Sequence, residues 1–490
     1  MSVLSELKPY NVFKYFEEIC SVPHGSGNTK QISDLCASFA EKMGLKYVQD
    51  ELNNLVIYKP ASKGMEDKET IILQGHMDMV CAKTAECMKD MASEGLDIYI
   101  DGDHVRAKDT SLGGDDGIAV AIILAILEDD ELVHPAIEAV FTVDEEVGMN
   151  GARGLDMSLL KGRRMLNLDS EEEGVFTVSC AGGLRMDCEI PCEYENTDEK
   201  TMSYNIIIDG LIGGHSGCEI DKGRGNAIKL MSRFLYRASK EIDNLRIADI
   251  KGGEFDNVIC NRCMARIYVP YQNASALEKL VSEFDGIYKD EFKVTDPEVS
   301  IKAVKNDILT NNSINKAFNT VDSNKIIDSL FLVPQGIAAM SPDINGLVQT
   351  SSNIGVVNTY ENGLKFTVSV RSSVSSQKHA LRDRIEAAVI GFGGNVTIRG
   401  EYPGWAYRKD SPVRDTLSRI YEKKTGKKPV ITAIHAGLEC GLFSEALNGL
   451  DCVSIGPELT DIHSVGEKLG IASVGRLYEM VVEFLRTYSS

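Results

Sequence analysis

Short apolar segments alternate with helix-length segments along the first 185 residues. The clearest short segments are Thr70–Gln74, Ala139–Val143 and Arg164–Leu168, and their length and composition predict buried β-strands. Between the first two lies Gly117–Leu127, which is apolar on every face, as expected of a helix covered on both sides. A strand, helix, strand order predicts an α/β domain with a mostly parallel sheet and helices on both of its faces.

The pattern loosens between residues 186 and 401, where strands alternate with amphipathic helices such as Ala274–Phe284 and Gln377–Phe392. From about residue 402 the helix–strand alternation returns. The elements predicted there are Val413–Lys424, Val430–Thr432, Cys452–Ile455 and a terminal helix at Ser473–Tyr488. This order predicts a catalytic-type α/β domain of residues 1–185 and 402–490, interrupted by an inserted α+β domain of residues 186–401.

Two stretches of the inserted region resemble one another. Asp256–Ile259 precedes the strand-like Cys263–Pro270, and Ser352–Gly355 precedes the strand-like Leu364–Ser373. The similarity is compatible with an internal duplication, in which each half supplies a small sheet with two covering helices.

Composition and charge narrow the range of functions. Hydrophobic residues at 43% and charged residues at 26% are typical of a globular protein and exclude wholesale disorder. A net charge of −21 disfavours nucleic acid or an anionic membrane as the main partner, and we expect neither. The first residues do not resemble a signal peptide, and twelve cysteines without a regular framework favour reduced thiols in the cytoplasm.

Histidine and acidic side chains follow the three predicted strands. His76 and Asp78 come after the first strand and would point to one side of an extended chain, which suits a metal ligand and the group that orients it. Glu145 and Glu146 follow the second strand, and one could bind a metal while the other acts as general base. Asp169 follows the third strand. Each motif also has a structural explanation, because single histidines are often structural and acidic loops are often merely solvated.

Two further positions complete a set of possible metal ligands. Asp115 lies in a glycine-rich turn before the buried helix, where an ordinary helix N-cap is the alternative. A phosphate-binding loop is excluded there, because adjacent carboxylates would repel phosphate and no Gly-Lys-Ser/Thr follows. His463 follows the last predicted strand. The set has two imidazoles and three carboxylates, which suit two divalent cations such as zinc: His76, Asp115, Glu146, Asp169 and His463. Four of the five follow predicted strands, and ligands of open α/β sheets gather at the carboxyl ends of strands.

Seven motifs resemble the co-catalytic zinc peptidases, a family with carboxypeptidase, tripeptidase and dipeptidase members. They are LQGHMDMV, LGGDDGIAVA, TVDEEVGMNGA, LNLDSEEEG, GLIGGHSGCEI, IHAGLECGLF and SIGPELTDIHS. The resemblance covers essentially the whole chain. It implies a zinc-peptidase-like catalytic domain with an inserted lid, and cytoplasmic hydrolysis of unblocked dipeptides, including Xaa-His dipeptides.

The resemblance also implies a role for each matching position. One zinc would be held by His76 and Asp169 and the other by Glu146 and His463, with Asp115 bridging them; Mn²⁺ or Co²⁺ could substitute. Asp78 would orient His76, and Glu145 would be the general base. A cis peptide bond is implied between Asp115 and Asp116, a position where related dipeptidases usually have asparagine.

Substrate contacts are implied at five more positions. His215 would donate a hydrogen bond to the oxyanion, and Arg371 would bind the substrate carboxylate through a bidentate fork. The remaining positions are Asn257, Gly437 and Glu439, of which Glu439 could pair with the substrate ammonium group. The ordinary alternatives are a surface histidine in a glycine-rich turn for His215 and a strand-surface charge for Arg371.

Other functions stay open at this point. The same metal chemistry could serve an aminoacylase, a deacetylase or a tripeptidase, and a non-catalytic binding protein could use the same scaffold. The expected partner is a small peptide. Both a monomer and a homodimer are compatible with the sequence, since a duplicated lid could substitute for a partner subunit.

Overall fold

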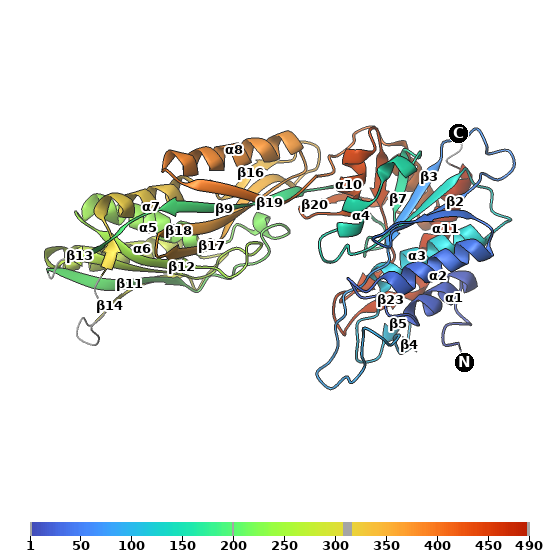
Figure 1. Cartoon of the computed structure of the whole chain (residues 1–490), viewed down its shortest axis with the longest axis horizontal. Coiled ribbons are helices and arrows are strands. Elements are labelled where there is room, and N and C mark those ends of the chain that lie inside the picture. Colours follow the sequence, from blue (N-terminus) through green and yellow to red (C-terminus); the bar gives the residue numbers. More distant parts are fainter. Residues whose placement is uncertain (1, 198–199, 307–315, 488–490) are drawn as a thin grey trace. The chain divides into compact units, whose positions relative to one another are not determined.

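The computed structural model describes residues 2–197, 200–306 and 316–487. The chain forms two compact units (Figure 1). Unit 1 consists of Met1–Cys180, Trp405–Ala433 and Leu438–Ser490, and unit 2 of Ala181–Gly404 and Ile434–Gly437. Unit 2 is therefore an insertion into unit 1.

Unit 1 is built on a mixed eight-stranded sheet with a parallel centre. The strands lie in the order β1 (Lys46–Gln49), β2 (Leu55–Lys59), β6 (Ile137–Thr142), β3 (Ile71–His76), β7 (Arg164–Asn167), β21 (Asp451–Ser454), β8 (Val175–Cys180) and β20 (Val430–Ile434). The neighbours β6, β3, β7 and β21 are parallel, whereas β1–β2, β2–β6 and β21–β8 are antiparallel pairs. Every residue of β3 and β6 is buried, which confirms the buried strands predicted from their apolar runs.

The apolar helix predicted beside these strands is α3 (Gly114–Glu128). Its residues from Gly114 to Leu127 are all buried, and it contacts β3 and the N-terminal helix α1 (Tyr10–Cys20). Its first turn departs from helical geometry at Asp115 and Asp116, which are joined by a cis peptide bond, as the family resemblance implies.

The remaining elements of unit 1 surround this sheet and form a small second one. The other helices are α2 (Lys30–Lys42), α4 (Asn150–Gly154), α9 (Pro412–Thr425), α10 (Glu439–Ala446) and α11 (Ile471–Thr487). The second sheet has the order β22 (Leu459–Thr460), β23 (Lys468–Gly470), β5 (His104–Ala107) and β4 (Ile98–Asp101). The predicted terminal helix corresponds to α11, and its predicted last residue, Tyr488, lies outside the described residues.

Unit 2 is an antiparallel sheet with helices packed on it. The strands of the sheet lie in the order β14 (Ser300–Lys305), β11 (Thr201–Asp209), β13 (Cys263–Pro270), β12 (Arg246–Gly252), β17 (Val348–Tyr360), β18 (Gly363–Ser372), β9 (Gly182–Pro191) and β19 (Asn395–Tyr402). One further strand, β16 (Gly336–Met340), pairs with β17. A separate pair joins β10 (Tyr194–Asn196) to β15 (Lys316–Phe318). The helices are α5 (Ala227–Glu241), α6 (Ala274–Glu291), α7 (Thr320–Leu332) and α8 (Ser375–Gly391), and all four contribute to one hydrophobic core with the sheet.

The strand order of unit 2 is mirrored about the contact between β12 and β17. Counted outward from this contact, β11, β12, β13 and β14 occupy the third, first, second and fourth places of one half. In the same chain order, β9, β17, β18 and β19 occupy the third, first, second and fourth places of the other half. In the sheet, the two halves pair through Lys251↔Asn358 and Gly252↔Val357. The architecture of one half is thus repeated in the other, while an internal duplication of the sequence stays a prediction.

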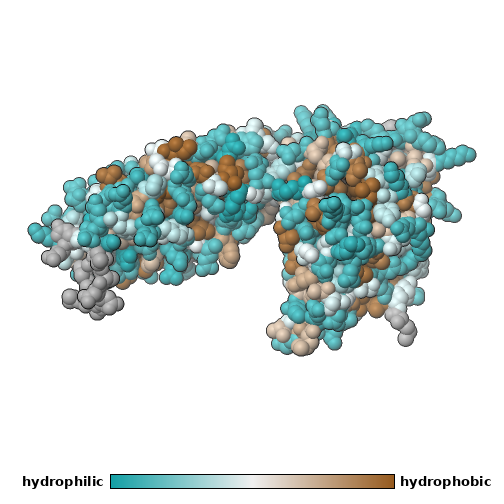
Figure 2. Space-filling model, in the orientation of Figure 1, coloured by the Kyte–Doolittle hydropathy of each residue, from teal (hydrophilic) through white to brown (hydrophobic). Residues whose placement is uncertain are grey.

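Hydrophilic residues cover much of the visible face of each unit, with hydrophobic residues scattered between them (Figure 2). Within the described ranges, no helix combines the length and the apolar character needed to cross a bilayer.

We expect Ile122→Ala to lower the free energy of unfolding of unit 1 by about 2–5 kcal/mol, because it leaves a cavity in a fully packed helix. Ile122 is entirely buried in α3. The control is Val133→Ala, at an exposed site of the same unit, which should change stability by no more than about 0.5 kcal/mol. Urea unfolding measures both, and equal effects of the two substitutions would contradict the packing described for α3.

Candidate metal centre

Three neighbouring parallel strands deliver polar side chains to the same edge of the unit 1 sheet. The register sets Gln74 of β3 opposite Asn167 of β7, and His76 of β3 opposite Thr142 of β6. Because the strands are parallel and in register, the segments that follow them emerge side by side.

All five side chains predicted as metal ligands meet at this edge. His76 Nε2 lies 3.2 Å from Asp115 Oδ1 and 3.5 Å from Asp169 Oδ1. His463 Nε2 lies 3.1 Å from Asp115 Oδ2 and 2.8 Å from Glu146 Oε1. The two oxygens of Asp115 therefore face two different imidazoles, as a bridging carboxylate would.

The ring of His76 is oriented by the main chain. Its Nδ1 lies 2.9 Å from the carbonyl oxygen of Asp78, whereas the Asp78 carboxylate is 3.5 Å away. With the proton on Nδ1, the lone pair of a neutral ring is on Nε2 and faces the carboxylates. The carboxylate of Asp78 instead accepts hydrogen bonds from Ser26 Oγ at 2.8 Å and from the backbone N–H of Glu145 at 3.1 Å. Asp78 thus orients both the imidazole and the backbone of Glu145.

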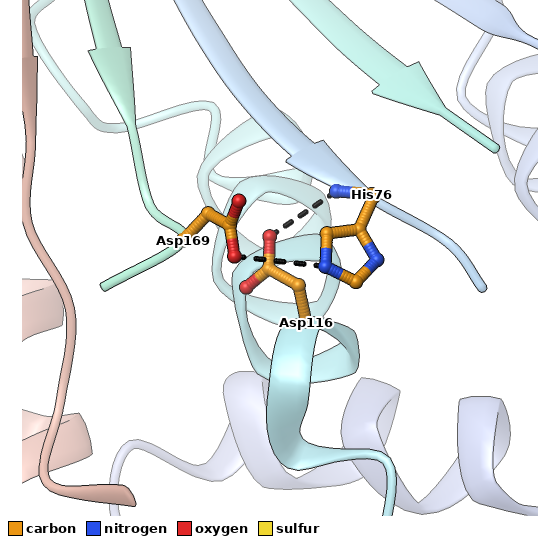
Figure 3. A group of neighbouring side chains, drawn as sticks. All are labelled: His76, Asp116 and Asp169. Atoms are coloured by element: carbon orange, nitrogen blue, oxygen red, sulfur yellow. Dashed lines mark hydrogen bonds and ion pairs between the residues drawn. The ribbon is translucent and has the colours of Figure 1, made fainter. Parts of the chain in front are cut away.

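A sixth side chain, the carboxylate of Asp116, joins the cluster of five. Figure 3 shows Asp116 and Asp169 beside His76, and Asp116 Oδ2 accepts a hydrogen bond from the backbone N–H of His76 at 3.1 Å. Asp116 is fully buried next to Gly75, where a Cβ would lie only 2.6 Å from its Oδ2. The sequence prediction did not count Asp116 as a ligand, and its only signal was a second aspartate beside the first.

The donor atoms fit divalent cations. Among the described residues, three groups have ligand atoms within 4.8 Å of one another: His76, Asp116 and Asp169; His76, Glu145 and Glu146; and Asp115, Glu146 and His463. Glu146 Oε1 is buried and makes no well-directed hydrogen bond, although it is close to His463. Mixed imidazole and carboxylate donors with free lone pairs suit divalent first-row cations. These residues could therefore hold metal ions.

Proton affinities in the centre are strongly shifted. Burial, reinforced by the nearby charge of Asp169, raises the pKa of Glu145 to about 9. Hydrogen bonds with Asp115 and Glu146 raise the pKa of His463 to about 10, and burial opposes them without prevailing. Burial alone would raise the pKa of Asp115, but its contacts with His463 and His76 hold this pKa well below its usual range. In the metal-free centre, Glu145 and His463 therefore hold protons, and binding of a divalent cation would displace protons from the centre.

Unit 2 contains four of the five residues predicted to contact substrate. His215 Nδ1 accepts hydrogen bonds from the N–H groups of Gly217 at 3.3 Å and Cys218 at 3.1 Å, so the ring proton of neutral His215 is on Nε2. The neighbouring Ser216 N–H donates to the carbonyl of Asn257 at 2.8 Å. Gly437 lies in the short 434–437 segment and is half-buried.

Arg371 is a buried guanidinium with few partners. It is 9% exposed, its NH1 donates to the Tyr402 hydroxyl at 3.1 Å, and its Nε has no hydrogen-bond partner. Arg371 lies opposite Ser351 in the β17–β18 ladder, and Ser351 Oγ is 2.7 Å from Nε2 of His435. Burial and the charge of Arg371 lower the pKa of His435 to about 3. Sequence reasoning missed His435 as a site residue, although its place two residues before Gly437 was a signal.

Glu439, the fifth predicted contact residue, lies in unit 1 as the first residue of α10. It is fully buried, and its Oε2 accepts hydrogen bonds from Gln74 Nε2 at 2.6 Å and Thr142 Oγ1 at 2.7 Å. Its Oε1 has no hydrogen-bond partner, and burial raises its pKa to about 7. The carboxylate is thus bonded to β3 and β6, and its pairing with a substrate ammonium group stays a prediction.

The chain is similar to known peptidases over nearly its whole length. It is 35% identical to the cytosol non-specific dipeptidase of Escherichia coli, over 99% of both chains. The crystal structure of aminoacylhistidine dipeptidase from Vibrio alginolyticus matches with a TM-score of 0.93 and 35% identity, over 99% of this chain and 98% of that one. Residues 207–296 match the peptidase dimerisation domain of the M20 family.

This chain belongs to the M20 family of peptidases. Two relatives that are 35% identical to it over nearly their whole length are both named as dipeptidases. The aminopeptidase PepT of Bacillus cereus, at 15% identity and a TM-score of 0.57, shares the fold over 99% of this chain and 100% of its own.

Chelator-treated protein should lose thermal stability as the pH rises from about 6.5 towards 10. The pKa of folded His463, about 10, exceeds the ordinary 6.5, so its ion pairs stabilise fully below that lower value and are lost as the ring deprotonates. Glu145 acts in the same direction, because folding favours its protonated form up to a pKa of about 9. Melting temperatures measured across this range should fall, and less steeply for His463→Gln. A flat profile for the wild type would contradict the contacts of His463.

Proposed function

We propose that this chain is a cytoplasmic metallodipeptidase that uses two zinc ions to hydrolyse unblocked dipeptides, Xaa-His dipeptides among them. The observation that carries the proposal is the convergence of two imidazoles on the two separate oxygens of Asp115, with Asp169 and Glu146 on either side. End-to-end similarity to two dipeptidases supports the same reaction for this chain.

The ligands divide into two sets around Asp115. His76 and Asp169 would hold one ion, Glu146 and His463 would hold the other, and Asp115 would bind both. Imidazole and carboxylate donors favour Zn²⁺, and Mn²⁺ or Co²⁺ accept the same donors. The ions would supply Lewis acidity to the attacking water and to the scissile carbonyl.

Glu145 is the general base of the proposed reaction. Its neighbour Glu146 contacts His463, whereas Glu145 is anchored through its backbone N–H to Asp78, which leaves its carboxylate available for proton transfer. Burial and neighbouring carboxylates give Glu145 a high proton affinity, and bound cations would lower it towards the working pH. Glu145 would take the proton of the attacking water and then deliver it to the leaving amine.

Unit 2 would bind the polar groups of the peptide. The Nε2–H of His215 is a hydrogen-bond donor for the developing oxyanion, and its tautomer is fixed by Gly217 and Cys218. Arg371 is buried without an ion pair among the described residues. Burying a charged guanidinium costs free energy unless an anion pairs with it. The substrate's terminal carboxylate fits its planar fork. Asn257 and Gly437 would contact the peptide backbone.

The partners follow from this assignment. The substrate is a small peptide, and we expect neither nucleic acid nor a membrane to bind. The match to a dimerisation domain favours a homodimer, whereas the mirrored half of unit 2 could make the chain self-sufficient as a monomer.

Metal analysis together with a peptide panel tests the function. Purified protein should contain about two zinc ions per chain, and a free dipeptide should be cleaved much faster than its N-acetyl analogue. Cleavage should stop with chelator and return with Zn²⁺. Rapid hydrolysis of the blocked compound would instead favour an aminoacylase or deacetylase, and faster cleavage of tripeptides would favour a tripeptidase.

Glu145→Gln should reduce kcat by about 10²–10⁴-fold, because the amide cannot accept the proton. Its metal content should stay at the wild-type level, since Glu145 is not assigned as a ligand. The matched control is Glu172→Gln, at an exposed position of the loop after β7, which should retain full activity. Wild-type turnover by Glu145→Gln would favour a different base or a non-catalytic role for the chain.

Arg371→Gln should raise KM for free dipeptides by about 30-fold or more, since losing one partner of a buried charge pair costs about 2 kcal/mol or more. The corresponding dipeptide amides lack the anionic carboxylate, so their slower cleavage should change little. Steady-state kinetics on both substrate series makes the comparison. A uniform loss on acids and amides alike would show that Arg371 does not recognise the carboxylate.

A further inference from the structure

Glu467 makes four hydrogen bonds to a single stretch of backbone. Its Oε2 accepts from the N–H groups of Leu112 at 2.7 Å and Gly113 at 3.1 Å. Its Oε1 accepts from those of Gly114 at 2.8 Å and Asp115 at 3.3 Å. The side chain is 3% exposed, and none of these contacts depends on a metal ion.

The backbone around α3 is shaped to receive this carboxylate. The first N–H groups of a helix have no partner within the helix, and successive N–H groups in a turn form a concavity for an anion. Gly113 has φ +67°, in the left-handed region that glycine adopts most easily, and a Cβ at Gly114 would lie 3.2 Å from Glu467 Oε1. Glycine at these two positions lets the carboxylate approach the chain closely.

The same residue is tied closely to His463. Between Asp461 and Glu467 the chain forms a compact turn, in which Ser464 Oγ donates to the Asp461 carbonyl at 2.6 Å and Gly466 N–H donates to Ser464 Oγ at 3.0 Å. The Glu467 N–H donates to the Ser464 carbonyl at 3.3 Å. Glu467 is thus separated from His463 by only three residues of restrained backbone, and it is connected to Asp115 by direct hydrogen bonding.

We propose that Glu467 is a positioning residue of the metal centre, which sets the spacing between Asp115 and His463 and so the affinity for the ion they share with Glu146. Asp115 and His463 lie far apart in the sequence, and a hydrogen-bonded carboxylate links their two segments before any ion binds. The inference rests on the proposed function only in requiring that the wild-type centre binds divalent cations.

Titration of metal-free protein with Co²⁺, followed by its visible absorption, tests this role directly. Glu467→Gln keeps the shape but replaces one acceptor oxygen with an N–H₂ group that would face backbone N–H donors. We expect its affinity for one of the two ions, the one held by Asp115, Glu146 and His463, to fall by roughly 10–100-fold, the range typical of residues that orient ligands. The control is Glu458→Gln, at an exposed position before the same turn, which should bind Co²⁺ as the wild type does.

The melting temperature of each metal-free variant separates positioning from general stabilisation. If Glu467→Gln melts earlier but binds both ions with wild-type affinity, Glu467 only stabilises the fold and the inference is overturned. If Glu467→Gln does not fold, the Co²⁺ titration is carried out with Glu467→Asp, whose shorter side chain cannot reach all four N–H groups. Glu467→Asp should then bind Co²⁺ more weakly than the wild type, and equal affinity would overturn the inference. Failure of the wild type itself to bind Co²⁺ would instead contradict the proposed function.

Discussion

The alignment of β3, β6 and β7 is the constraint on which the candidate centre depends. A parallel register fixes where each strand ends. His76 is the last residue of β3, Glu146 comes four residues after β6, and Asp169 comes two residues after β7. A shift of one residue in any of these strands would turn its polar group away from the others, because successive side chains point to opposite faces. The chemistry of the edge is therefore set by hydrogen bonds in the interior of the sheet.

A buried polar network supports this register below the centre. Gln74 of β3 bonds through its amide nitrogen to Glu439 and accepts a hydrogen bond from Asn167 of β7 at 2.6 Å, while Thr142 of β6 donates to the same glutamate. These side chains are fully buried, so each unpaired group would cost free energy, and their mutual bonding favours one alignment of three strands. Gln74 and Asn167 each lie two residues before a candidate metal ligand, His76 and Asp169 respectively.

The sequence predicted the parts of this arrangement that follow from local patterns. Apolar runs predicted β3, β6, β7 and the buried helix α3, and residue type with strand position predicted that His76, Asp115, Glu146, Asp169 and His463 would come together. The bonds of Glu467 could not be predicted in this way, because they join its carboxylate to backbone N–H groups in a distant segment. Every residue except proline has the same backbone N–H group, so residue type does not indicate which of these groups a distant carboxylate will bind. The contact of Asp116 with His76 and the burial of Glu439 were missed for a related reason, since both depend on how a side chain turns once the fold has formed.

The division of unit 1 into three chain segments has a consequence for its synthesis. Domains tend to fold as units while the chain is being made, beginning from the N-terminus. The segment 1–180 is translated before unit 2, but its sheet lacks β20 and β21 until the main segment of unit 2, residues 181–404, has also been translated. Unit 2 lacks only the four residues 434–437 once its main segment has been made, so it can fold while unit 1 is still missing a strand from the middle of its sheet. His463 and Glu467 are translated after unit 2, so the acidic centre can assemble only when the segments on both sides of unit 2 have been made.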